Sequence, residues 1–127
     1  MMNNPYQQYK QTQVSTASPG ELVLMLYNGA IKNINVALGH LDRGEKDEFR
    51  VKVDKTLDIV TELMVNLSPD GGDITNNLRS LYDFVISRLI SGSAKFERKP
   101  VEEALPVITG LRDTWQEMLK QGVKKPE

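Results

Sequence analysis

The residues able to carry chemistry are few, and their spacing does not match known catalytic patterns. His40 is the single histidine and there is no cysteine. A di-iron bundle needs Glu-x-x-His pairs on two helices, but Ala37 stands three residues before His40. Gly71 and Gly72 follow a proline rather than a strand, and no lysine completes a phosphate-binding loop there. We therefore expect no enzymatic activity, no metal and no cofactor.

His40 suggests one alternative, because some helical bundles carry a single phosphorylatable histidine. That role requires an exposed imidazole in the middle of a helix, where an acidic partner can approach. His40 instead stands in the last turn of the first expected helix, within Gly39-His40-Leu41-Asp42. A histidine suits that position because the C-terminal end of a helix carries partial negative charge. We expect a capping role, with phosphotransfer at His40 as the alternative.

Composition narrows the class of protein further. The 127 residues fit one domain, and the net charge of −1 leaves no basic excess for nucleic acid or an anionic membrane. The longest apolar run, Leu22 to Tyr27, has six residues, far fewer than the ~20 that span a bilayer. The first ten residues lack the charged and apolar regions of a signal peptide. We expect a cytosolic protein without membrane insertion.

The elements that position these residues are predicted to be four helices. Ser18, Pro19 and Glu21 form the pattern of a capping box with proline at the first helical position. Gly44 suits the left-handed residue that ends a helix, and Ser68 to Gly72 form a clear break. These signals predict an antiparallel up-down four-helix bundle over 18–122, preceded by an arm and followed by a frayed tail. The predicted ranges are 1–17 for the arm, 18–43, 47–67, 73–90 and 100–121 for the helices, and 123–127 for the tail.

Two features of the last helices carry their own predictions. Residues 91–99 read as a polar connection, with Pro100 at the first position of the fourth helix. Pro106 removes a backbone hydrogen bond and crowds the preceding turn. We expect the fourth helix either to kink near Pro106 or to begin its regular part there.

The first and third helices carry more apolar surface than one buried face needs. In each, the apolar residues cover an arc far wider than the ~100° stripe that faces a core, whereas the second and fourth helices are narrower. Burial as the central pair would explain this. A homodimer contact, a groove for a partner chain, or an N-terminal arm folded back with Tyr6, Tyr9 and Val14 would also cover the surface. Tyr27 and Tyr82 suit either a binding surface or the core, and Trp115 is more typical of the core.

Several stretches resemble the flagellin-specific export chaperones of the FliS family. The resemblance is carried by Asn4 to Lys10, Thr16 to Ala30, Leu81 to Phe84, Arg88-Leu89 and Leu111 to Trp115. It implies a helical bundle that binds the C-terminal segment of flagellin in the cytosol, prevents premature polymerisation and delivers it to the flagellar type III export apparatus. A self-assembling structural bundle, including a weak homodimer, remains the alternative.

The resemblance and the wide apolar arcs together give the expected client-binding residues. The positions taken from the family motifs are Tyr6, Tyr9, Pro19, Leu22, Leu26 and Tyr27. Tyr82 and Ile86 are added from the arc of the third helix. The family's N-terminal arm covers part of the groove when no client is bound, which assigns that covering role to Tyr6 and Tyr9.

Overall fold

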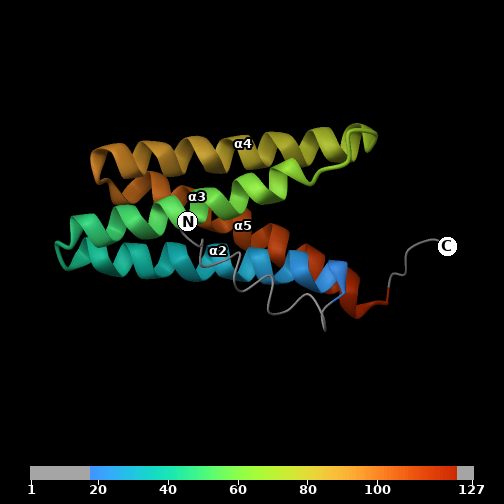
Figure 1. The fold of residues 1–127 in the computed structure, drawn as a ribbon, viewed down its shortest axis with the longest axis horizontal. Coiled ribbons are helices and arrows are strands. Elements are labelled where there is room, and N and C mark those ends of the chain that lie inside the picture. The colour runs from blue at the N-terminus through green and yellow to red at the C-terminus, as the bar shows by residue number, and fades with distance from the viewer. Residues whose placement is uncertain (1–17, 123–127) are drawn as a thin grey trace, which may run out of the picture.

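The computed structural model describes residues 18–122, and these residues form four long α-helices (Figure 1). The predicted arm and tail lie outside the described residues. The helices are α2 (Pro19–Asp42), α3 (Lys46–Val65), α4 (Gly72–Lys95) and α5 (Arg98–Lys120). The prediction of an all-α four-helix bundle is confirmed.

The four helices pack as a closed ring of neighbours. Helix α2 packs on α3 and α5, and α4 packs on the same two helices. Helices α2 and α4 therefore face each other across the diagonal of the bundle. The core between them is almost entirely apolar, and its largest fully buried apolar side chains are Phe49, Ile34, Ile59, Leu89, Val53, Val60, Val85 and Val101.

Helix α2 begins and ends where its local sequence predicts. The Glu21 backbone N–H donates to Ser18 Oγ at 3.2 Å, and the Ser18 N–H donates to Glu21 Oε1 at 3.1 Å, which completes the capping box. At the other end, Gly44 adopts a φ of 78°, the left-handed conformation that glycine accepts without steric cost. Residues close in sequence therefore account for both ends of α2.

Helix α4 runs to Lys95, past its predicted end near Ile90, and only Phe96 and Glu97 connect it to α5. The prediction of a polar connection over 91–99 is therefore wrong. Gly92 is buried, and a Cβ there would lie only 2.5 Å from Val101 Cγ2, so a glycine permits the close approach of α4 to α5. Packing against α5 thus extends the helix through residues whose types favour a break.

Phe96 ends α4 in the left-handed conformation, with φ 54° and ψ 47°. Its ring lies beneath the guanidinium of Arg50, 4.2 Å from the ring centroid, and 6.5 Å from the ring of Phe49. Arg50 Nη2 also donates to the Ser93 carbonyl at 2.8 Å, which satisfies part of the helix end. These contacts hold a conformation that is unfavourable for a residue with a Cβ.

Helix α5 begins at Arg98, so Pro100 is its third residue rather than its first. Proline is tolerated there because the first turn lacks intrahelical partners for its N–H groups. The helix continues through Pro106 to Lys120. The alternative in which regular structure begins at Pro106 is therefore wrong.

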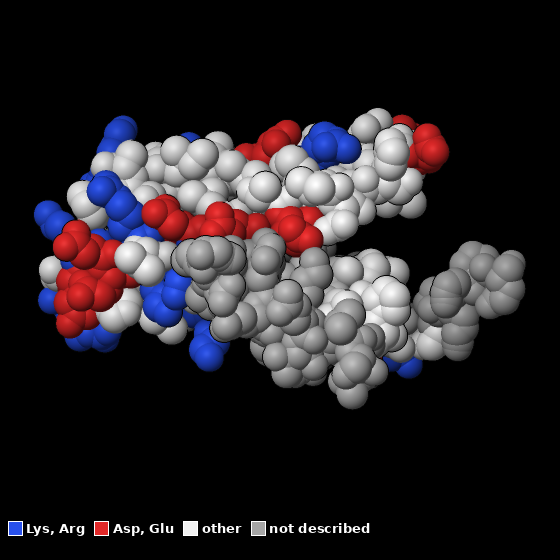
Figure 2. Space-filling view, in the orientation of Figure 1, with Lys and Arg blue, Asp and Glu red and all other residues white. Residues whose placement is uncertain are grey.

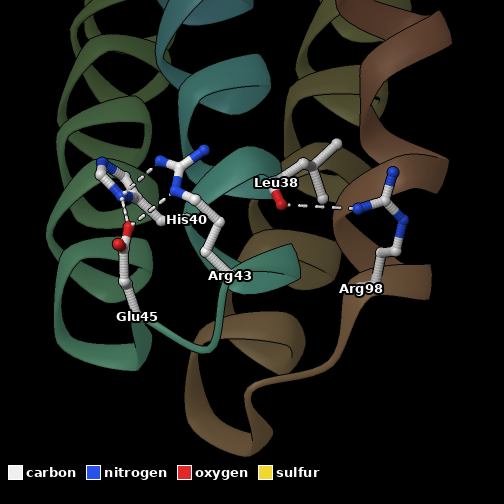
Figure 3. A network of polar contacts seen from close by, with 5 residues as sticks. All are labelled: Leu38, His40, Arg43, Glu45 and Arg98. Carbon is white, nitrogen blue, oxygen red and sulfur yellow. Dashed lines mark hydrogen bonds and ion pairs between the residues drawn. The ribbon is translucent and has the colours of Figure 1, made fainter.

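Polar contacts join the helices at the end of the bundle where α2 meets α3 (Figure 3). His40 Nδ1 lies 2.7 Å from Glu45 Oε1, and Arg43 Nε donates to the same carboxylate oxygen at 3.1 Å. Arg98 of α5 binds Asp42 Oδ1 at 2.6 Å and reaches the Leu38 carbonyl at 3.5 Å. His40 therefore lies in the last turn of α2, as predicted, and its imidazole contacts the Glu45 carboxylate that follows the helix.

Candidate functional site

An apolar cavity of about 360 Å³ opens at the opposite end of the bundle. Figure 1 shows α3 and α4 separating there from the N-terminus of α2 and the C-terminus of α5, and Figure 2 shows an indentation between the two pairs. All four helices contribute to its lining, which consists of Pro19, Leu22, Val23, Leu26, Leu63, Asn66, Leu67, Tyr82 and Trp115. No charged side chain lines it, so the cavity suits apolar side chains of a bound chain.

The first turn of α2 is fixed on one side of this cavity by α5. Trp115 Nε1 donates to the Gly20 carbonyl at 2.8 Å. A Cβ at Gly20 would lie 2.8 Å from Leu119 Cδ2, so the absence of a side chain allows α2 and α5 to approach closely. This attachment positions Pro19 and Leu22 along one wall of the cavity.

The last turn of α3 forms the facing wall. Leu63 is buried in the core, while Leu67 is half-buried and packs against it. Asn66 Nδ2 donates to the Glu62 carbonyl at 2.8 Å and to Glu62 Oε2 at 3.1 Å. The side-chain amide of Asn66 is therefore hydrogen-bonded to Glu62 of α3. The apolar part of this wall consists of Leu63 and Leu67.

Tyr82 of α4 lines the cavity and joins it to the core. Its hydroxyl lies 2.7 Å from the hydroxyl of Tyr27, and both side chains are only 4% exposed. Burial is the main cause that raises the pKa of both phenols, so both stay neutral at physiological pH. Tyr27 does not line the cavity and contacts Tyr82, which does.

The structure gathers four of the predicted client-binding residues around this one cavity: Pro19, Leu22, Leu26 and Tyr82. Tyr27 contacts the cavity only through Tyr82, and Ile86 is a half-buried residue packed on the core outside the lining. Tyr6 and Tyr9 lie outside the described residues. A contact of any of these residues with a client stays a prediction.

Sequence reasoning did not place the cavity residues that come from the second and fourth helices, or Val23 of the first. Leu63 belongs to the narrow apolar face of α3 and Leu67 follows that helix, while the sequence favours a core position for Trp115. The signal that could have identified these residues is the antiparallel order of the helices. In an antiparallel bundle the end of one helix lies beside the start of its neighbour, so Leu67 had to lie near Pro19 and Leu22.

The two helices with wide apolar arcs differ in the structure. On α4, four large apolar side chains are exposed, namely Ile74, Leu81, Phe84 and Ile90. On α2, every large apolar side chain is buried or half-buried. Excess apolar surface is therefore observed on α4, whereas acidic side chains gather along α3 (Figure 2). Within 18–122, no group of three or more histidine or acidic residues is arranged to hold a metal.

By length and composition alone, helix α2 is long and apolar enough to cross a membrane. In the structure it packs along two other helices of the bundle, and a third of its most apolar stretch is buried. The core helix of a helical bundle can have the same length and composition, so this property is weak evidence for membrane insertion.

Comparison with known proteins points to one family. The family described as "Flagellar protein FliS" matches residues 2–122. The flagellar secretion chaperone FliS of Bacillus subtilis is 30% identical, and the alignment covers 94% of this chain and 89% of that protein. The FliS chaperone of Vibrio cholerae is also 30% identical, over 92% and 90% of the two chains. A crystal structure of a bacterial flagellar chaperone superposes with a TM-score of 0.76 at 22% identity, covering 92% of this chain and 96% of that one.

Proposed function

Because this chain belongs to the flagellar protein FliS family, we propose that it binds the C-terminal segment of flagellin in the cytosol. As a flagellar secretion chaperone it keeps flagellin from polymerising and delivers it to the flagellar export apparatus. The observation that supports flagellin as the client is the uncharged cavity at the open end of the bundle, lined by Pro19, Leu22 and Leu26 of the motif that resembles the family.

The chemistry of the cavity fits an unfolded client. A volume of about 360 Å³ accommodates a few aliphatic side chains rather than a folded domain. The exposed apolar residues Leu81 and Phe84 on α4 offer further contacts for a chain that wraps around the bundle. A disordered segment needs such a large surface because its ordering costs a few kcal/mol on binding.

The test is titration calorimetry with monomeric flagellin and with flagellin lacking its C-terminal segment. We expect one-to-one binding to the intact protein and no binding to the truncated one. Equal binding of both forms, or of neither, would refute the proposal. A mass that rises with concentration, without flagellin binding, would instead favour self-assembly through the exposed face of α4.

A matched pair of variants connects binding to the cavity. Leu22 lines the cavity, whereas Leu105 is a half-buried leucine of α5 outside it. We expect Leu22→Ala to weaken flagellin binding at least tenfold and Leu105→Ala to leave it within twofold of the wild type. Urea unfolding of both variants separates an effect on the site from an effect on stability. Similar affinities for the two variants would place the client elsewhere.

A further inference from the structure

The Tyr27–Tyr82 contact crosses the bundle between helices that are not packed neighbours. Helices α2 and α4 each pack on α3 and α5 and face one another along the diagonal. The hydroxyl groups of Tyr27 on α2 and Tyr82 on α4 nevertheless lie 2.7 Å apart inside the core. On α2, the core position Ala30, three residues after Tyr27, carries a small side chain and is fully buried. The hydroxyl contact is therefore a direct polar connection between α2 and α4 through a core that is mostly apolar.

This contact couples the core to the cavity. Tyr82 is part of the cavity lining, together with Trp115 and Leu26, whereas Tyr27 is not. The hydroxyl oxygen of a tyrosine lies on the axis of the Cβ–Cγ bond, so anchoring it restricts rotation about the Cα–Cβ bond and fixes where the ring lies, while the ring can still turn about its own axis. The position of the Tyr82 ring, and with it one wall of the cavity, then depends on the Tyr27 hydroxyl.

We propose that Tyr27 is a positioning residue that fixes the ring of Tyr82 as a wall of the cavity and thereby sets the shape available to the bound segment. The proposal rests on the function proposed above, because it assigns a role within the same site. It predicts that the hydroxyl pair contributes to client affinity separately from its contribution to stability.

Three variants separate these two contributions. Tyr27→Phe and Tyr82→Phe each leave one buried hydroxyl without its partner, which lowers the urea midpoint. The double variant removes both hydroxyls and is expected to recover most of the stability, because no buried polar group is left unpaired. Thr56→Val is the control, since Thr56 is fully buried and its Oγ1 bonds the Lys52 carbonyl, away from the cavity lining.

The first readout needs no client. Trp115 is the only tryptophan of the chain and lines the cavity beside Tyr82, so quenching of its fluorescence by acrylamide reports on the cavity. We expect the quenching constant to change at least 1.5-fold in Tyr27→Phe and in the double variant, and to stay unchanged in Thr56→Val. The second readout is affinity for the C-terminal segment of flagellin, which we expect to fall at least fivefold in the same two variants.

Recovery of stability, quenching and affinity together in the double variant would overturn the proposal, because the hydroxyls would then serve only the core. An equal loss of affinity in Thr56→Val would also overturn it, since general destabilisation would explain the effect. If the wild-type protein fails to bind flagellin, the proposed function is refuted, while the quenching data still decide whether Tyr27 shapes the cavity.

Discussion

The sharpest test of the packing compares two glycines inside helices, Gly92 of α4 and Gly110 of α5. Replacing a glycine in a helix by alanine raises the free energy of unfolding by about 1 kcal/mol when the added methyl group has room, because alanine has the higher helix propensity. A Cβ added at Gly110 would meet no atom of a neighbouring residue within 4 Å. We therefore expect Gly110→Ala to stabilise the protein by about 1 kcal/mol and to raise the melting temperature by about 4 °C.

Gly92 should respond in the opposite direction. A Cβ there would lie 2.5 Å from Val101 Cγ2 and 3.0 Å from the Glu97 carbonyl oxygen, whereas carbon atoms prefer separations of about 3.5–4.0 Å. Val101 is fully buried and β-branched, so its methyl group has little freedom to move away. Overpacking of this kind costs about 1–3 kcal/mol. Because two groups clash, we place the cost near the upper end, which leaves a net loss of about 1–2 kcal/mol after the propensity gain.

Urea unfolding followed by far-ultraviolet circular dichroism measures both variants on the same scale. A Gly92→Ala protein as stable as the wild type would refute the close approach of α4 and α5 at this point. The double variant Gly92→Ala/Val101→Ala provides an internal check, because Val101→Ala removes the clashing methyl. Its destabilisation should be smaller than the sum of the two single losses, as expected for residues in direct contact.

Three further predictions concern the helix ends and the client. Replacing Arg50 by Ala should destabilise the protein by about 1–2 kcal/mol in urea unfolding, because the variant loses the bonds to the Ser93 carbonyl and the contact with the Phe96 ring; an unchanged midpoint would contradict this role. The hydrogen bond to His40 lowers the pKa of Glu45, so its stabilising effect is present above the ordinary glutamate pKa and is lost as the pH falls through the lowered value. Melting temperatures measured across this acidic range should therefore fall slightly less in Glu45→Gln than in the wild type, and parallel curves would argue against the contact. Calorimetry of flagellin binding at several temperatures should give a markedly negative heat-capacity change because apolar surface is buried, and a value near zero would argue against apolar wrapping.

The parts of the fold that sequence could predict are those decided by neighbouring residues. The capping box at Ser18 and the left-handed Gly44 satisfy local backbone requirements, and both appear where predicted. The end of α4 was missed because Gly92 and Ser93 favour a break by type, whereas both are buried against neighbouring helices. Tertiary packing decides such cases, and a single sequence does not reveal which glycine lies at a helix crossing.

The candidate site divides in a similar way. Leu22 and Leu26 could be singled out from the motif and from the wide apolar arc of α2. The arc could not distinguish the cavity wall from the core, because periodicity identifies an apolar face without showing how far neighbouring helices separate. Tyr27 illustrates the limit, since its side chain is buried and approaches the cavity only through Tyr82.

The connections between the helices hold the two ends of the bundle unequally. At one end, only residues 43–45 join α2 to α3 and only residues 96–97 join α4 to α5, and Arg98 adds bonds between α5 and α2. At the cavity end, the longer segment 66–71 joins α3 to α4. We therefore expect α2 and α5 to move away from α3 and α4 more readily at the cavity end than at the end with the two short connections. Leu38 and Leu63 are equally buried in helices at opposite ends, so slower amide hydrogen exchange at Leu38 than at Leu63 is expected when opening is confined to the cavity end.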